Sequence, residues 1–238
     1  MPKIATFLAP YSLAVSFLYL LGFWGTFNVN VLEYIALTDV VKNAIVPLLY
    51  SSFFILAGFI IGNVFILPIE KLMPPGGGAD LPEAKYIRWF LILMALSMFV
   101  AALYQMFFEV GNYRWFKVAT LVFIPLIVVV GDASFAEQYI KQKHLRVLVV
   151  NSLIAVLLYS FGCGAIDAHK AKNSEQTLKI NNVTSKHIYL GWAGDYLFLW
   201  NKKEESVVTM FKSTVKQIEL SIPKEKPIID LSKYKEKT

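Results

Sequence analysis

Cysteine is almost absent from this 238-residue sequence, which contains only Cys163. A single cysteine excludes a disulfide within the chain, a zinc site made of four cysteines and a CxxC redox motif. Because Cys163 lies at the end of an apolar run, we expect it to be a small buried apolar residue.

Histidine and the usual signatures of catalysis are also scarce. The three histidines, His144, His169 and His187, do not have metal-ligand spacing, and no HExxH occurs. The sequence has no G-x-S-x-G nucleophile motif, P-loop or dinucleotide-binding fingerprint. We therefore expect a protein that is not an enzyme and that holds neither a metal nor a cofactor.

Charge is the third scarce property, since only 17% of the residues are charged and 56% are hydrophobic. Soluble domains carry about 25% charged residues. About 20 apolar residues in a helix cross the hydrocarbon layer of a membrane. We predict that residues 1–166 form a transmembrane helical domain, an α-helical membrane bundle of about five transmembrane helices. The predicted spans are residues 4–27, 44–66, 86–108, 115–130 and 145–166.

The segments around these spans are more polar. Prolines and glycines preclude regular structure over residues 67–85. The polar segment 131–146 predicts a helix lying at the membrane surface, and residues 167–176 predict a helical linker into water. The fourth span is the shortest and contains Pro125; without it, both termini would lie on one side of the membrane.

Short segments rich in β-branched and aromatic residues begin at Thr177. They are separated by turn residues such as Asn181-Asn182 and Ala193-Gly194, which is the pattern of successive hairpins. We predict a small all-β C-terminal domain over residues 177–222, either an SH3-like barrel or a twisted sheet. The expected strands are residues 178–180, 187–190, 195–200, 206–210 and 215–220. A basic flexible tail is expected over 223–238.

Basic residues indicate the orientation of the chain in the membrane. Lys170 and Lys172 follow the fifth span, and most of the formal net charge of +6 lies toward the C-terminus. Lys and Arg next to spans favour the cytosolic side. We expect a multi-pass protein of the bacterial inner (plasma) membrane with its C-terminal domain in the cytosol. The lipid bilayer is its first partner, and nucleic acid is not expected because the basic charge is diffuse.

Four residues within the predicted spans are candidates for helix packing. Gly58 and Gly62 form a GxxxG pair, which suits close approach of two helices within one chain or in a homo-oligomer. Gln105 and Asn151 are polar residues in apolar helices, and a hydrogen bond between helices is their expected role. Gly162 and Gly164, at the end of the fifth span, suit either close packing or a flexible joint.

Aromatic residues and lysines make the β domain the candidate binding region. Stacked aromatic rings with neighbouring lysines suit a nucleotide-like ligand, whereas the alternative is an ordinary aromatic core with a rim of solvated lysines. The apolar run Tyr196–Trp200 has no clean alternation, so one face must pack the core and the other must be covered. The candidate ligand-binding residues are Lys186, Tyr189, Trp192, Tyr196, Trp200, Lys202 and Lys203.

Three functions fit this organisation. The first is a membrane effector or small gated channel whose cytosolic β domain binds a ligand or partner and is coupled to the helices. The second is an immunity or assembly factor that binds another membrane protein. The third is a transporter of small solutes, against which stands the lack of acidic and basic residues in the middle of the spans.

Overall fold

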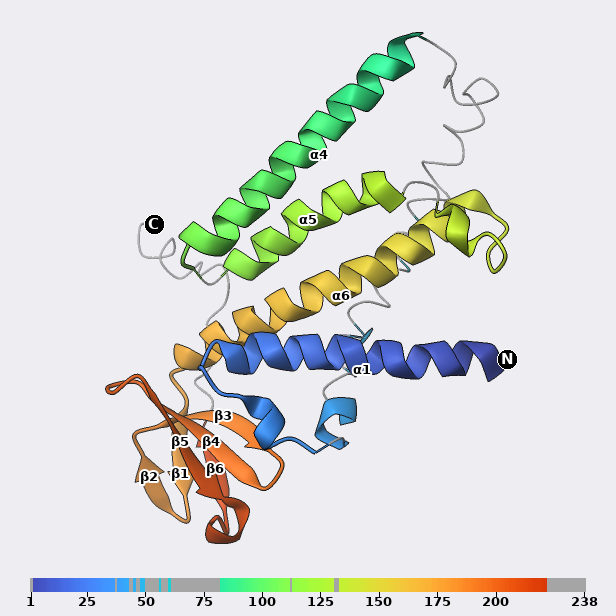
Figure 1. Cartoon of the computed structure of the whole chain (residues 1–238). Helices are drawn as coiled ribbons and strands as arrows, with labels where there is room; N and C mark the ends of the chain where they lie inside the picture. Colours follow the sequence, from blue (N-terminus) through green and yellow to red (C-terminus); the bar gives the residue numbers. More distant parts are fainter. Residues whose placement is uncertain are drawn as a thin grey trace, which may run out of the picture. The chain divides into compact units, whose positions relative to one another are not determined.

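The computed structural model describes residues 2–36, 38–42 and 82–221, apart from 112, 131 and 132, together with five single positions between 45 and 60. The chain divides between His169 and Lys170 into a helical unit and a β unit (Figure 1). Apart from those single positions, the predicted second span lies outside the described residues. So do the glycines at its centre, Gly58 and Gly62, and the predicted tail 223–238.

Four α-helices have their bounds within the described residues: α1 (Pro2–Gly25), α4 (Pro82–Phe108), α5 (Arg114–Val130) and α6 (Lys143–Lys172). Short 3₁₀ turns lie at Val31–Glu33 (η1) and Ser134–Ala136 (η4). Two of the described helices, over Lys85–Phe108 and Leu145–Lys172, are long and apolar enough to cross a membrane. The described apolar part of α1, Ala9–Gly25, is shorter, and α5 has 17 residues.

Side-chain contacts fix the direction of α5 relative to α6. The rings of Trp115 and Phe161 lie 5.0 Å apart, and those of Phe123 and Tyr159 lie 6.2 Å apart. The Tyr159 hydroxyl donates to Thr120 Oγ1 at 3.0 Å. Higher numbers on α5 thus meet lower numbers on α6, so the two helices are antiparallel.

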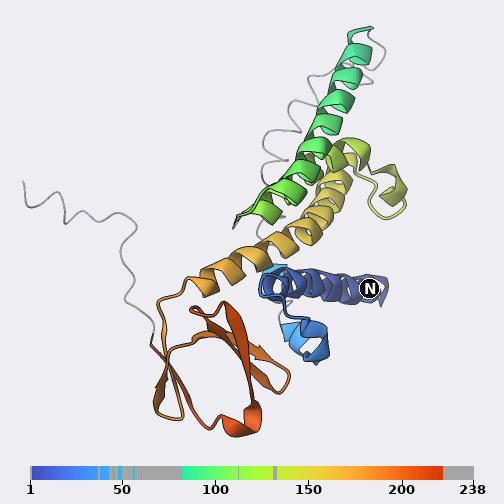
Figure 2. The same ribbon diagram turned by 60° about the vertical axis from the view of Figure 1, so that its left-hand side comes forward.

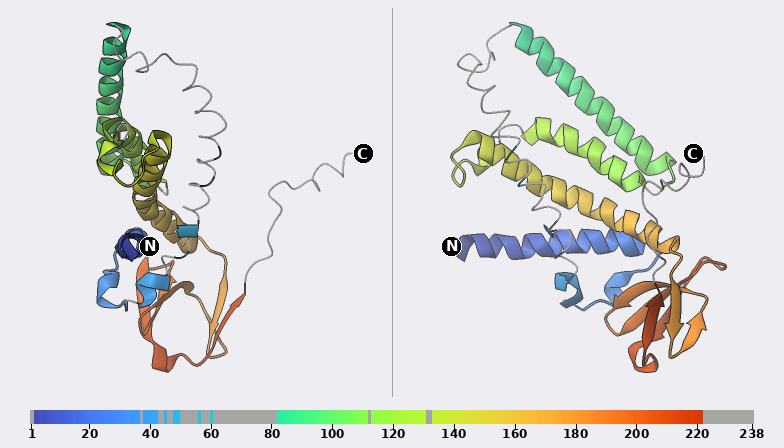
Figure 3. Two further views of the ribbon diagram at one scale, coloured as in Figure 1. Left: turned by 90° about the vertical axis from the view of Figure 1, so that its right-hand side faces the viewer. Right: turned by 180° about the vertical axis from the view of Figure 1, so that it is seen from behind.

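Helix α1 runs parallel to α6. The Tyr11 hydroxyl donates to the Leu153 carbonyl oxygen at 3.0 Å, and the Tyr19 hydroxyl donates to Asp167 Oδ2 at 3.0 Å. Figure 3 shows α4, α5, α6 and α1 following one another in a row. The C-terminal ends of α1, α4 and α6 and the start of α5 therefore share one end of the bundle.

Glycine allows α1 and α6 to cross at close range. A Cβ atom on Gly22 would lie 2.1 Å from the Phe161 carbonyl oxygen, and one on Gly164 would lie 2.1 Å from the Tyr19 carbonyl oxygen. A Cβ atom on Gly162 would make a tight but less severe contact, 3.1 Å from the backbone of Phe116 in α5. Of the two roles expected for Gly162 and Gly164, close packing is therefore the one found.

Cys163 is exposed, so the expectation of a buried residue was wrong. Residues adjacent in a helix point about 100° apart, because one turn takes 3.6 residues. The two neighbouring glycines occupy the contacts with α5 and α1, and Cys163 points away from both.

The helix predicted over 131–146 was also wrong for the described residues, because 133–142 form only the turn η4 and further turns. This segment folds onto Arg146, whose surface is only 4% exposed. The Arg146 guanidinium donates to the Ile140 carbonyl oxygen at 3.2 Å and lies 3.8 Å from Glu137. A buried guanidinium needs several acceptors, and a loop that curls around it supplies them where a helix would not.

The described residues of the β unit form six strands in two antiparallel sheets, which face each other (Figure 2). One sheet has the order β2-β1-β6 and the other β3-β4-β5. The sequence analysis missed β2, a three-residue strand. The strands are β1 (Thr177–Ile180), β2 (Val183–Ser185), β3 (Ile188–Ala193), β4 (Tyr196–Asn201), β5 (Ser206–Phe211) and β6 (Ile218–Ser221).

The core between the sheets is formed by Leu178 and Ile180 from β1 and by Leu197 and Leu199 from β4. The β1–β2 turn is the predicted Asn181-Asn182, with φ of 50° and 66°. Two successive residues with positive φ form the turn whose twist suits a two-residue hairpin, and asparagine adopts positive φ readily. The Asn181 side chain also holds the β5–β6 connection. It donates to the Thr214 carbonyl oxygen at 2.9 Å and accepts from the Lys216 and Gln217 amides.

Candidate functional site

Strand β4 buries side chains on both faces of its sheet. Leu197 and Leu199 point into the core between the two sheets. Because side chains alternate along a strand, Tyr196, Phe198 and Trp200 point to the opposite face, which we call the outer face. The strand register adds side chains from β3 and β5 to this face, since cross-strand partners share a face. The outer face comprises Ile188, Tyr196, Phe198, Trp200, Val207, Thr209 and Phe211.

Two aromatic contacts organise the outer face. The Lys172 ammonium lies 4.7 Å from the centre of the Trp200 ring, which is a cation–π geometry. The Tyr196 and Phe211 rings meet edge to face, with centroids 5.3 Å apart. Phe198 and Trp200 are only 1% and 7% exposed. The expected cover is found around Phe198 and Trp200, whereas Thr209 and Phe211 on the same face are exposed.

The seven predicted ligand-binding residues do not gather at one place. Tyr196 and Trp200 lie on the outer face, whereas the register puts Tyr189 and Trp192 opposite Leu199 and Leu197, on the core side. The lysines are in turns: Lys186 lies between β2 and β3, and Lys202 and Lys203 lie between β4 and β5, all exposed. No single aromatic platform with a rim of lysines results.

Tyr189 belongs to the packing of the β unit. It is partly buried against the core cluster, and burial raises the pKa of its phenol. Desolvation disfavours the charged form, so the hydroxyl stays protonated at neutral pH. This residue is suited to a structural role.

Sequence reasoning missed Lys172 and Phe211, which make the two main contacts of the outer face. Phe211 becomes visible only when the β4–β5 register is known, because that register pairs it with Tyr196. Lys172 was read as a charge that orients the protein in the membrane. It is the last residue of α6, and its side chain extends back over the sheet that follows.

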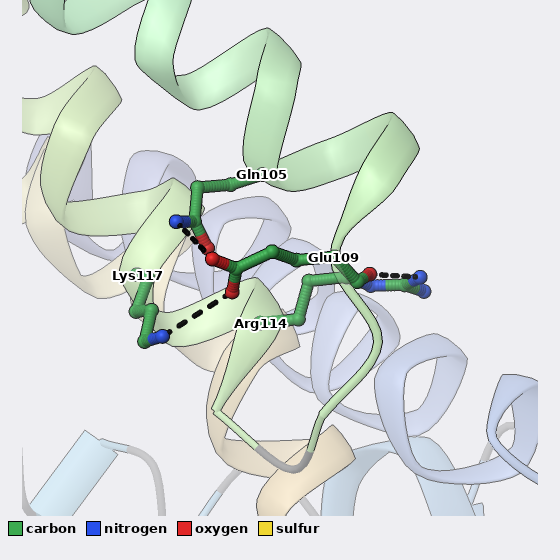
Figure 4. A network of polar contacts seen from close by, with 4 residues as sticks. All are labelled: Gln105, Glu109, Arg114 and Lys117. Carbon is green, nitrogen blue, oxygen red and sulfur yellow. Dashed lines mark hydrogen bonds and ion pairs between the residues drawn. The ribbon is translucent and has the colours of Figure 1, made fainter.

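A polar network joins α4 to α5 in the helical unit (Figure 4). Gln105 Nε2 donates to Glu109 Oε1 at 2.8 Å, and Lys117 Nζ lies 3.3 Å from Glu109 Oε2. Arg114 donates to the Glu109 carbonyl oxygen at 3.2 Å. Glu109 therefore links Gln105 of α4 to Lys117 of α5. The ion pair is partly exposed, so we expect it to add at most about 1 kcal/mol.

Two buried side-chain oxygens, Gln105 Oε1 and Asn151 Oδ1, have no hydrogen-bond partner among the described residues. A direct bond between helices, the role predicted for both residues, is thus not seen at these atoms. Within the described part of the chain, no three histidine, cysteine, aspartate or glutamate side chains come together as metal ligands do.

Comparisons with protein-family models, with curated proteins and with solved structures found no match to this chain.

Proposed function

We propose that this chain is a multi-pass protein of the bacterial inner membrane, with about five spans and a cytosolic β domain. The β domain binds a partner, and α6 couples it to the helices; the protein is not an enzyme. One observation carries the proposal: α6 continues as one helix from its apolar part to Lys172, whose ammonium contacts Trp200 in the sheet.

Membrane insertion is supported by α4. Large apolar side chains are exposed along it, including Tyr86, Phe90, Leu93, Val100 and Phe108. Such a surface is costly in water and suits hydrocarbon. The ends of the helices also agree with a chain that crosses the membrane back and forth. If α1 and the predicted second span both cross the membrane, then α4, α5 and α6 cross it in alternating directions. Residues 25, 108, 114 and 166 then lie on the same side of the membrane.

Helix α5 is the shortest of the proposed spans. Its 17 residues extend about 26 Å at 1.5 Å per residue, close to the thickness of a thin bilayer. Lys170 and Lys172 at the end of α6 favour the cytosol for that side.

For the β unit we propose an SH3-like barrel. The first strand pairs with the last, β1 with β6, and the two sheets enclose one core. Closing a small sheet in this way reduces the number of unpaired strand edges.

A partner protein is favoured over a nucleotide-like ligand. The predicted aromatic residues are divided between the two faces of the sheet, so a base has no platform flanked by lysines. Trp192 on the edge strand β3 is exposed, and a single exposed tryptophan suits a protein interface.

Fractionation tests the membrane part of the proposal. Full-length protein should stay in the membrane pellet after an alkaline carbonate wash. Protease should remove the β domain from inverted vesicles but leave it intact in right-side-out vesicles. Release by carbonate, or digestion in right-side-out vesicles, would overturn insertion or orientation respectively.

Coupling is tested by Lys172→Met, with Lys172→Arg as the matched control that keeps the cation. In the full-length protein, hydrogen exchange should rise in both the last turn of α6 and strand β4 for Lys172→Met only. A rise in hydrogen exchange confined to α6 would show that the Lys172 contact does not couple α6 to the β domain.

A photoreactive residue at Trp192 should give a protein adduct in cells, with Val183 as an exposed control on β2. Equal labelling from both positions would count against a partner site.

A further inference from the structure

Each sheet of the β unit has two edge strands, and three of these four edges are protected against further pairing. Strand β2 has three residues, and β6 has four and carries Glu219. Strand β3 has a register shift between Tyr189 and Gly191, and Gly191 has a φ of 144°. Short length, charge and bulges are the means by which natural sheets block their edges.

Strand β5 lacks all of these protections. Its six residues, Ser206–Phe211, include no charge and no proline, and its register with β4 is unbroken. Among the described strands it pairs only with β4, which leaves one row of its backbone amides and carbonyls without a strand partner. Thr209 and Phe211 are exposed beside that edge. Such an edge is a template for an additional strand.

We propose that β5 pairs with β5 of a second copy of this chain, antiparallel and centred on Thr209. A two-fold axis perpendicular to the sheet leaves the side chains of both copies on the same face of the combined sheet. Two residues that pair across this axis must therefore belong to the same face of β5. With Thr209 on the axis, Thr209 meets Thr209 and Val207 meets Phe211 on the outer face. Threonine pairs and pairs of an aromatic with a β-branched residue are favourable cross-strand neighbours.

Charge at the two ends of β5 selects the antiparallel arrangement. Glu204 and Glu205 precede the strand and Lys212 follows it. In the proposed register the turn Lys202–Glu205 of one copy, which carries both glutamates, lies near Lys212 of the other at both ends of the pair. A parallel arrangement would instead place like charges beside each other, which opposes pairing. The pairing uses none of the residues assigned to partner binding or coupling, so it goes beyond the proposed function.

Cross-linking of the full-length protein tests the register. Thr209→Cys is made in a Cys163→Ala background, and an added oxidant such as copper phenanthroline accepts the two electrons released when two thiols join. Directly opposed residues in antiparallel strands have Cα atoms about 4.5–5.5 Å apart, a separation that a disulfide spans. Thr184→Cys, exposed on edge strand β2, is the matched control. We expect a two-chain product from Thr209→Cys and little from Thr184→Cys.

Mass measurement in detergent provides the second readout. The unmodified chain should be a dimer, and Thr209→Lys should shift it to a monomer, because it brings two ammonium groups together on the axis. Hydrogen exchange of β4 and the core strands should stay unchanged in Thr209→Lys, which separates lost pairing from lost folding. A monomeric unmodified chain, a dimer that survives Thr209→Lys, or equal cross-linking from the two cysteine positions would overturn the proposal.

Discussion

The helical unit and the β unit place apolar side chains in opposite ways. In α4, Tyr86, Phe90 and Phe108 are 76%, 65% and 73% exposed, whereas Leu178, Leu197 and Leu199 of the β unit are at most 1% exposed. The charged residues of the β unit lie in its turns and on exposed strand positions. One chain thus contains a unit with a buried apolar core and a unit with many large apolar side chains on its surface.

The forces that hold each unit together differ accordingly. In the proposed membrane setting, hydrocarbon gives helices no hydrophobic reason to associate, so close backbone packing and a few polar contacts hold the bundle. The α1–α6 crossing at Gly22 and Gly164 is such a contact. The β unit relies on a leucine and isoleucine core and on turns fixed by hydrogen bonds. Four substitutions test this difference, from the largest expected effect to the smallest.

Gly164→Ala attacks the helical unit where the backbones are closest. The new methyl would lie 2.1 Å from the Tyr19 carbonyl oxygen and 2.9 Å from the Phe23 amide, and no rotamer relieves a clash with backbone. We expect a loss of more than about 3 kcal/mol, measured as thermal unfolding of the detergent-solubilised protein. Gly25→Ala is the control, because nothing lies within 4 Å of a Cβ there. Equal midpoints for the two variants would show that α1 and α6 do not cross at these glycines.

Leu199→Ala tests whether the β unit unfolds by itself. Removing a fully buried leucine costs about 3 kcal/mol, a large part of the stability of a domain this small. Hydrogen exchange in the full-length protein should rise across the strands while α4 and α5 keep their protection. Leu220→Ala, at an exposed position on β6, should change little. Loss of protection in α4 and α5 as well would show that the two units unfold as one.

Asn181→Gly removes the hydrogen bonds that hold the β5–β6 connection but keeps a residue that adopts positive φ easily. We expect a loss of about 1–2 kcal/mol, visible as faster amide exchange at Lys216 and Gln217. Asn182→Gly, at the next turn position, should lower the free energy of unfolding by only a few tenths of the loss expected for Asn181→Gly. If both variants behave alike, the backbone conformation of the turn matters more than the Asn181 side chain.

Tyr189→Phe has the smallest expected effect and appears only at high pH. Burial raises the pKa of the Tyr189 phenol in the folded protein, so the unfolded chain loses this proton first, near pH 10. The stability that the protonated Tyr189 phenol contributes is fully present below that pH and is lost as the pH rises through the pKa of the folded protein. Between pH 8 and 11 the midpoint of thermal unfolding should therefore fall less steeply with pH for Tyr189→Phe than for the unmodified protein. Parallel curves would place the Tyr189 hydroxyl in water.

Periodicity and hydropathy predicted the helices well where apolar runs are long. The predicted spans 86–108, 115–130 and 145–166 lie within or close to α4, α5 and α6. The helical linker predicted over 167–176 corresponds in part to the polar end of α6, which continues to Lys172. Strand β2 was missed because three residues on a sheet edge leave almost no pattern.

The candidate site was harder to predict because its residues come together only through strand register. Tyr189, Trp192, Tyr196 and Trp200 are all aromatic and close in sequence, but a hairpin places alternate residues on opposite faces. Composition indicates which residues are present and cannot assign them to a face. The β3 irregularity between Tyr189 and Gly191 adds a shift that no turn motif indicated.

The parallel packing of α1 against α6 sets an order for assembly during synthesis. Tyr11 and its acceptor Leu153 are 142 residues apart, so α1 leaves the ribosome long before the helix that it packs against. At roughly 5–20 residues per second, α1 waits about 7–28 s for that neighbour. In the proposed membrane setting, its crossing surface at Gly22 meanwhile faces lipid or an insertion factor. Truncation of the chain before α6 should therefore leave α1 without its docking surface, and quality-control proteases should degrade such fragments faster than the full-length protein.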